Sequence, residues 1–208
     1  MREAQRPSFA RSCTGIVATL GVVLSGGAAA IAAMSETPPL GQTPAAERPW
    51  SATIAPADEP GERLTVTGTV FADDGKTPLP GADLYIYHTD RSGLYDRDSR
   101  SSTNPRLQAR LRTNDDGRYA FHTIKPGPYP EGNVAAHIHY VISMPGHDKQ
   151  SFELLFAADP YLDDETRQRA AAGRVCKIVS PIPNADGILQ ASCDIIYREV
   201  EPGDLGKR

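Results

Sequence analysis

The sequence predicts an all-β protein, a β-sandwich of mostly antiparallel strands with long loops and one short helix. Glycine and proline are abundant, with 18 of each among 208 residues, which is typical of a turn-rich chain built from strands. Short segments that alternate apolar and polar residues recur between these turn signals, as half-buried strands do. Helical composition is confined to residues 163–173 (DDETRQRAAAG), and that segment is short.

The N-terminus is typical of an export signal. Three arginines precede an apolar run of small residues, Thr14–Ala33, that ends in the small side chains a signal peptidase requires. We therefore expect residues 1–33 to be a cleaved signal peptide and the mature protein to be exported, periplasmic or extracellular, with no stable membrane insertion. The alternative is a retained membrane anchor, because the run approaches spanning length.

The rest of the chain divides by composition into an arm, a body and a tail. Residues 34–63 are rich in proline, alanine and glutamate without an apolar period, so we expect a Pro-rich arm or linker in which Trp50 is the one large anchor. Residues 64–200 form the expected sandwich, which is long enough to bury a core. Residues 201–208 are left as a C-terminal tail.

The expected strands follow one another with turn sequences such as ADDGKTPLPGA, NDDG and PIPNADG between them. Residues 64–71 (LTVTGTVF) and 82–89 (ADLYIYHT) alternate apolar and polar side chains, as strands with one buried face do. The later segments also alternate apolar and polar side chains, or are rich in β-branched and apolar residues. In chain order they are residues 106–113, 118–124, 135–144, 150–157, 175–180 and 191–197.

Two cysteines remain once the leader is removed, Cys176 and Cys193. In an oxidising compartment such a pair suggests a disulfide. The two strands that carry them are separated by a turn sequence, so a hairpin would place the cysteines opposite each other. The alternative is two buried free thiols.

The strongest candidate site lies in and around the strand at residues 135–144. His137 and His139 are two residues apart, so on a strand both imidazoles point to the same face. Tyr129 shortly before them and Tyr95 earlier in the chain add two phenols. Phenolate is a hard anionic donor, so these four side chains would suit a trivalent metal, although ordinary strand histidines produce the same pair.

Four segments carry a resemblance to a known family. The opening half alone, GTVFADDGKTPLPGADLYIY followed by RTNDDGRYAFHTIKPG, is also similar to noncatalytic transthyretin-like or carboxypeptidase-regulatory-like sandwiches. The segments GTVFADDGKTPLPGA, DRSGLY, TIKPGPYP and AHIHY, in this order, resemble the intradiol ring-cleavage dioxygenases, the catechol and protocatechuate dioxygenase family. The resemblance covers about residues 64–159.

The resemblance implies a nonheme Fe(III) held by Tyr95, Tyr129, His137 and His139, with a solvent hydroxide completing the shell. Tyr95 and His137 match the ligands that stay in place, and His139 the second, axial histidine. Tyr129 matches the ligand that leaves when substrate binds, and its phenolate takes up a substrate proton. The implied reaction uses dioxygen to cleave a small aromatic diol between its hydroxylated carbons, giving a muconate-type dicarboxylic acid. Within the family the metal acts as Lewis acid and template.

The sequence departs from the family pattern at two positions. Val134 stands where the family has an arginine that stabilises anionic species beside the ring. Glu153 stands where the family has a glutamine, and its carboxylate changes the local charge, so it joins Tyr129 as a candidate catalytic residue. Two functions therefore stay open: an intradiol dioxygenase, or a transthyretin-like sandwich that binds a metal or ligand without turnover.

Other charged and titratable residues match no motif position. We expect three histidines to be surface or strand side chains: His88, His122 and His147. Three arginines near Tyr95 in the chain could bind a substrate carboxylate, but a solvated loop is favoured: Arg97, Arg100 and Arg106. The net charge of −4 predicts no nucleic-acid partner, and the oligomeric state is left open.

Overall fold

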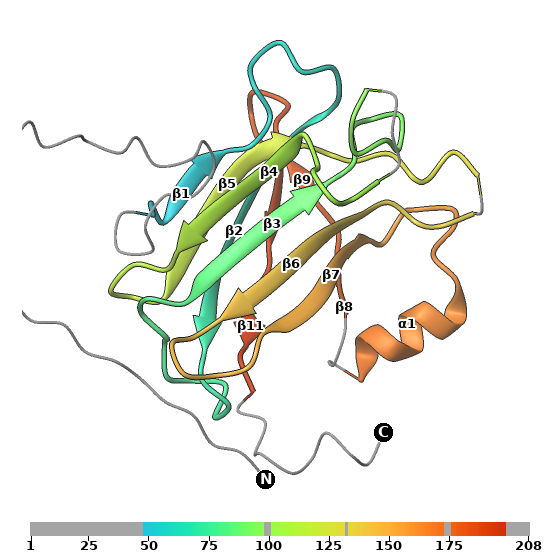
Figure 1. Cartoon of the computed structure of the whole chain (residues 1–208). Coiled ribbons are helices and arrows are strands. Elements are labelled where there is room, and N and C mark those ends of the chain that lie inside the picture. The colour runs from blue at the N-terminus through green and yellow to red at the C-terminus, as the bar shows by residue number, and fades with distance from the viewer. Residues whose placement is uncertain (1–47, 98–100, 132, 173–175, 199–208) are drawn as a thin grey trace, which may run out of the picture. The chain divides into compact units, whose positions relative to one another are not determined.

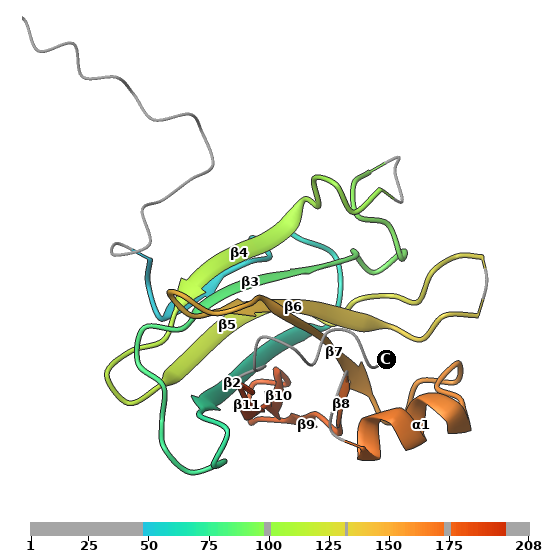
Figure 2. The same ribbon diagram turned by 60° about the horizontal axis from the view of Figure 1, so that its bottom comes forward.

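The computed structural model describes residues 48–97, 101–131, 133–172 and 176–198. In this part of the chain two β-sheets pack face to face, which confirms the predicted β-sandwich (Figures 1 and 2). The expected signal peptide, the first part of the arm and the C-terminal tail lie outside the described residues.

The first sheet is built around a long antiparallel pair, in which Val66 lies opposite Phe121. Within the described residues it has six strands, in the order β1-β5-β2-β10-β9 with β11 also paired to β2. Short strands join the central pair in parallel at both sides. The bounds are β1 (Ser51–Thr53), β2 (Arg63–Phe71), β5 (Arg118–Ile124), β9 (Ile182–Pro183), β10 (Leu189–Ser192) and β11 (Ile195–Ile196).

The second sheet carries the histidine pair. Its order in the described chain is β4-β3-β6-β7-β8, antiparallel except for the last pair. The bounds are β3 (Asp83–His88), β4 (Leu107–Arg112), β6 (His137–Ser143), β7 (Gln150–Phe156) and β8 (Cys176–Val179).

The predicted helix is present as α1 (Asp164–Ala171), which lies beside β8 (Figure 1). It begins where predicted because the Asp163 side chain accepts a hydrogen bond from the Thr166 amide, a typical N-cap. The helix is polar and buries none of its residues. No helix among the described residues is long and apolar enough to cross a membrane.

The two-residue alternation of the strands separates a core face from an outer face. On β3, Leu84 and Ile86 are buried between the sheets, whereas Tyr85 and Tyr87 stand half-exposed on the outer face. The core on the other side includes Val66 and Phe121 from the long pair. The outer face of the second sheet is therefore the surface available for a site.

The end of the expected arm lies on the sandwich, because its backbone continues the sheet. Strand β1 pairs with β5, and Ile54 and Ala55 behind it are buried. Trp50 is not the anchor: its carbonyl accepts a hydrogen bond from the Ala120 amide, but its side chain is 48% exposed. The segment is fixed by strand pairing and small apolar side chains.

The structure does not form the predicted Cys176–Cys193 disulfide. Cys193 is a buried free thiol that follows β10 in the first sheet. Cys176 begins β8, where its backbone lies opposite Glu153 of β7 in the second sheet; its side chain is outside the described part. The hairpin that forms instead joins β9 and β10, so the two cysteine segments enter different sheets.

Candidate metal centre

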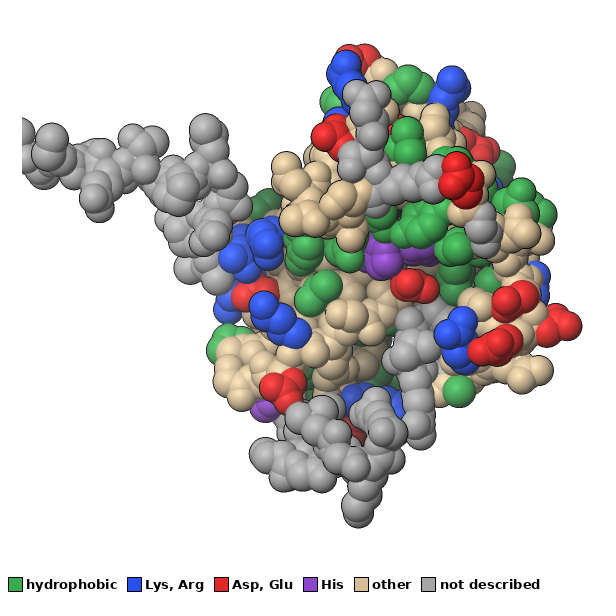
Figure 3. Space-filling view, turned by 45° about the vertical axis from the view of Figure 1, so that its right-hand side comes forward, with side chains coloured by type: hydrophobic (Ala, Val, Ile, Leu, Met, Phe, Trp, Pro, Cys, Tyr) green, Lys and Arg blue, Asp and Glu red, His purple; other side chains and the backbone are tan. Residues whose placement is uncertain are grey.

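The histidine pair sits at the start of β6 and points outward. The two Nε2 atoms of His137 and His139 are 3.0 Å apart, as expected for side chains two residues apart on a strand. His137 is buried, and the side chain of His139 keeps 21% of its surface exposed. Figure 3 shows histidine side chains reaching the surface among hydrophobic ones, with an acidic side chain beside them.

The loop after β3 brings Tyr95 to these histidines. Its turn is closed by Asp90, whose carboxylate accepts the Ser92 amide at 2.8 Å and the Leu94 amide at 3.2 Å. An aspartate that bonds its own following backbone makes such a turn rigid. The DRSGLY segment therefore places Tyr95 by backbone geometry, with its side chain 3% exposed.

A second loop, which follows β5, brings in Tyr129. The two loops lie so close that a Cβ on Gly93 would be 2.0 Å from the Pro128 carbonyl oxygen, and one on Gly127 would be 2.2 Å from that of Arg91. Gly93 also has φ +79°, a conformation that other residues rarely adopt. The glycines of the DRSGLY and TIKPGPYP segments are therefore required for the two tyrosines to meet.

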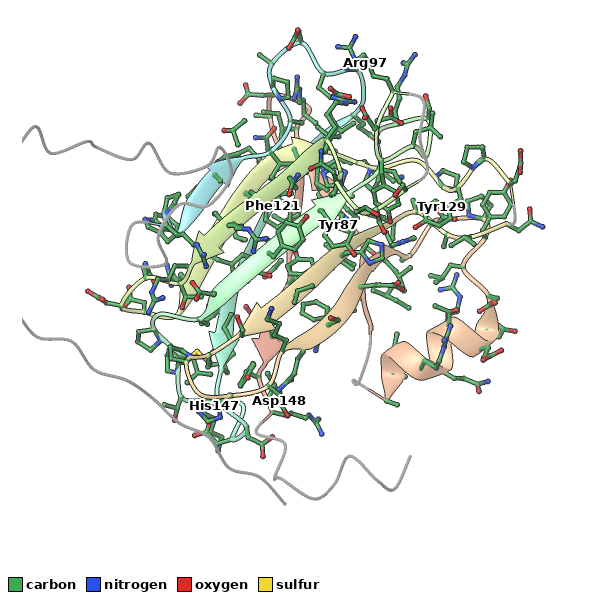
Figure 4. The ribbon with its side chains drawn as sticks, viewed as in Figure 1. Tyr87, Arg97, Phe121, Tyr129, His147 and Asp148 are labelled. Carbon is green, nitrogen blue, oxygen red and sulfur yellow. The ribbon has the colours of Figure 1, made fainter. Side chains whose placement is uncertain are left out.

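The four predicted ligand atoms converge on one point. The Tyr95 oxygen lies 2.6 Å from the Tyr129 oxygen and 2.6 Å from the His139 Nε2 atom. The Tyr129 oxygen lies 3.3 Å from the His137 Nε2 atom. In Figure 4 Tyr129 is at the end of the sheet where β6 begins.

Hydrogen bonding orients a nitrogen lone pair of His137 toward the point where the four atoms converge. The Nδ1 atom of His137 lies 2.7 Å from the Ala135 carbonyl oxygen, which can only accept, so Nδ1 carries the proton. In the neutral imidazole the Nε2 atom of His137 then carries the lone pair, and it faces the Nε2 atom of His139. The Ala136 amide donates to the buried Asp159 carboxylate at 3.0 Å and so fixes the strand entry.

Burial favours the neutral form of three of these groups, Tyr95, Tyr129 and His139. It raises the pKa of Tyr95 far above its ordinary value, with the Tyr129 hydroxyl adding to the shift, and it raises the pKa of Tyr129 as well. Burial and the neighbouring His137 lower the pKa of His139 to about 4. A trivalent cation would reverse this preference for the phenols, because its charge favours phenolate. The donor set therefore fits Fe(III), with two imidazoles and two phenols that become anionic.

His139 has two further neighbours across the sheet. On β3, Tyr87 lies opposite it, and the rings stack with centroids 4.5 Å apart at 18°. On β7, Glu153 lies opposite it, with a carboxylate oxygen 3.8 Å from Nδ1. Tyr87 was not among the predicted site residues, although alternation along the strand at residues 82–89 places it on the same outer face.

The other predicted residues are not part of this cluster. Val134 is 40% exposed, just before the strand. His88 is fully buried on β3, with its Nε2 atom 2.7 Å from the Thr123 hydroxyl. His122 is exposed on β5, and His147 is exposed in the turn after β6. Figure 4 places His147 at the opposite end of the sheet from Tyr129.

The arginines near Tyr95 have different surroundings. Arg97 is exposed, as a solvated loop residue should be (Figure 4), and Arg100 lies outside the described residues. Arg106 forms a double hydrogen bond with the buried Glu59 carboxylate, with Nη2 2.8 Å from Oε1. Its backbone amide donates to the Tyr95 carbonyl at 2.8 Å. The side chain and the backbone of Arg106 therefore both bond within the protein and stabilise the loop that carries Tyr95.

A β-sandwich that gathers two phenols and two imidazoles at one end of a sheet offers a donor set suited to a metal ion. The family model described as Dioxygenase matches residues 36–198, most of the chain. The chain belongs to the intradiol ring-cleavage dioxygenase family.

Individual relatives agree with this assignment. Catechol 1,2-dioxygenase of Acinetobacter baylyi is 33% identical over 141 residues, which are 59% of this chain and 45% of that protein. Chlorocatechol 1,2-dioxygenase of Rhodococcus opacus is 34% identical over 128 residues, which are 53% of this chain and 49% of that protein. The chain spans about half the length of the curated relatives it matches.

A solved structure of comparable size shares the fold. It is the dioxygenase domain of a dioxygenase–carbohydrate-binding protein fusion from Streptomyces sp. SirexAA-E, with a TM-score of 0.56. The match covers 72% of this chain and 90% of that one at 24% sequence identity.

Proposed function

We propose that the protein is an Fe(III)-dependent intradiol dioxygenase that cleaves a catechol-type aromatic with dioxygen to a muconate-type dicarboxylic acid. The observation that carries the proposal is the convergence of the oxygen and nitrogen atoms of Tyr95, Tyr129, His137 and His139. The membership in the family and the printed activities of the relatives support it.

Two side chains of the cluster are held in place by the fold, whereas a third can move when a substrate binds. Tyr95 and His137 are buried and tied to the fold, Tyr95 by its closed loop and His137 by its bond to Ala135. Tyr129 is only half-buried and lies on a loop that no strand pairing fixes. Tyr129 is therefore the side chain that can yield its place to a substrate oxygen.

A substrate diol must lose protons to bind through both oxygens, and Tyr129 is positioned to accept one at its phenolic oxygen. Burial already raises the pKa of this group, so the phenolate becomes a strong base once it turns away from a cation. When bound, Fe(III) would supply the Lewis acidity that activates the diol toward dioxygen. The protein's own residues bind and orient the diol and accept its proton.

A sandwich that binds a metal without turnover is the second candidate, and Val134 favours it. The side chain at this position is apolar and exposed, so it provides no positive charge to stabilise an anionic species. A bound metal is compatible with both candidates. They differ in whether oxygen is consumed.

Oxygen uptake with catechol by the iron-loaded protein tests the proposal. We expect uptake with a dicarboxylic acid product and a large loss of rate in Tyr129→Phe, since the proton acceptor is removed. Tyr161→Phe is a matched control, because that tyrosine is 41% exposed and outside the cluster. An iron-loaded protein that consumes no oxygen with catechol, chlorocatechol or hydroxyquinol would leave the binding function instead.

We also propose that the protein works outside the cytoplasm. The arginines ahead of the apolar run Thr14–Ala33 support this proposal. Mass determination of the N-terminus from the exported fraction should give a start near residue 34. Recovery of the intact chain from the membrane fraction would indicate an anchor.

A further inference from the structure

His139 is the member of the cluster with a neighbour on each adjacent strand. The register places Tyr87 of β3 opposite it on one side and Glu153 of β7 on the other. The Tyr87 ring covers one face of the imidazole. Rotation of the imidazole is thus restricted by a ring packed against it and a charge at its edge.

The two nitrogens of His139 face different surroundings. Its Nε2 atom is in the donor cluster, 2.6 Å from the Tyr95 oxygen. Its Nδ1 atom is on the far side of the ring and faces the Glu153 carboxylate at 3.8 Å. This distance exceeds that of a hydrogen bond, so the contact acts through charge. A carboxylate on that side favours the proton on Nδ1 and leaves the Nε2 lone pair for a metal.

Glu153 is close enough for its charge to influence the whole cluster. One carboxylate oxygen of Glu153 and one ring nitrogen each of His137 and His139 lie within 4.8 Å of one another. Its side chain is 43% exposed, so it retains solvent on one side while its charge faces His139. A negative charge beside a metal centre stabilises the more highly charged ion.

We propose that Glu153 is a positioning residue, the outer-sphere carboxylate of His139, which strengthens binding of Fe(III) and favours it over Fe(II). This inference rests on the proposed iron site. Glu153 then acts through the imidazole and not on the substrate. Groups that orient a metal-bound histidine in this way typically change metal affinity by about 10- to 100-fold when they are lost.

The test compares Glu153→Gln with the wild-type chain by ferric-ion competition against nitrilotriacetate. Glu153→Gln keeps the shape and removes the charge, and we expect about tenfold weaker Fe(III) binding with a smaller change for Fe(II). The tyrosinate-to-iron absorption band should move to longer wavelength, because iron accepts an electron more easily without the nearby charge. Glu153→Asp, which retains the charge, should restore most of the affinity.

Glu165→Gln is the matched control, since it removes one exposed carboxylate from α1 and should change neither readout. Unchanged affinity and spectrum in Glu153→Gln would overturn the inference. Loss of iron as complete as in His139→Ala would also overturn it, because Glu153 would then be a direct ligand. A wild-type chain that binds no Fe(III) would instead refute the proposed function. Thermal unfolding of the metal-free variants verifies that each is folded.

Discussion

At the scale of single residues, the cluster brings four potential metal-binding side chains within hydrogen-bonding distance of one another. The Nε2 atoms of His137 and His139 are 3.0 Å apart. The neutral imidazole of His137 donates its proton from Nδ1 to Ala135, so its Nε2 atom carries none. Two phenols with raised pKa values fill the same space. Groups with perturbed pKa values that gather in this way are typical of functional sites.

The first prediction concerns Tyr95. Tyr95→Phe removes one donor atom and should lower Fe(III) affinity by more than about tenfold, because an anionic ligand is lost. Iron content after dialysis against a chelator measures the effect. Tyr85→Phe is the control, since Tyr85 is also on the outer face but bonds to Gln108. Equal iron retention by the two variants would remove Tyr95 from the site.

The second prediction concerns His88, which is buried and bonded to Thr123. Burial lowers its pKa to about 4, below the value of the unfolded chain. The unfolded state therefore binds more protons between about pH 4 and 6.5, so His88 makes the folded state less stable as pH falls through this window. The cost should reach about 2 kcal/mol on going from pH 7 to pH 5.

Urea unfolding at these two pH values measures the His88 contribution. His88→Asn should be less stable at neutral pH but lose less stability on acidification. His147→Asn is the matched control, because it makes the same replacement at an exposed histidine. If the wild-type chain and His88→Asn respond equally to pH, the buried histidine is not the source of the effect.

At the scale of elements, the site depends on two loops held together by glycines. Gly93→Ala should destabilise the fold by about 2–4 kcal/mol, because its Cβ would overlap the Pro128 carbonyl as well as strain φ. It should also weaken iron binding, since the loops that carry Tyr95 and Tyr129 must separate.

Gly146→Ala is a matched control for this change. Gly146 also has a positive φ, +82°, but no atom lies within 4 Å of its added Cβ. It should therefore show the cost of backbone strain alone, about 1–2 kcal/mol, with iron binding retained. Equal effects of the two alanines on iron binding would mean that close contact between the loops is not required.

At the scale of the whole molecule, the segment before β2 is tied to the body by a partly buried ion pair. Glu59 is 9% exposed and is bonded to Arg106, which keeps the pKa of this carboxyl below its usual value. Glu59→Ala should cost about 2–3 kcal/mol of unfolding free energy, because Arg106 is left partly buried without its partner. Glu62→Ala, at an exposed position of the same segment, should cost less than about 0.5 kcal/mol.

Local sequence patterns were sufficient to predict the fold class and the residues of the candidate site. Alternation along the strands predicted the sandwich, and the DRSGLY, TIKPGPYP and AHIHY segments predicted the four residues that converge. Long-range pairing was harder to foresee. The segment after β8 crosses to the other sheet, so the expected cysteine hairpin was wrong, and Trp50 points outward although it is the largest side chain of its segment. Such choices depend on partners distant in the chain, which a local pattern does not contain.

The visible spectrum of the leaderless protein, loaded with iron and then mixed anaerobically with catechol, tests the central claim most directly. We expect a tyrosinate-to-iron band on loading, because Tyr95 and Tyr129 would both face the ion, and a shift of this band when catechol replaces Tyr129. A protein that stays colourless after iron loading would contradict the account. Colour that catechol does not change would contradict the assignment of Tyr129 as the ligand that yields to substrate.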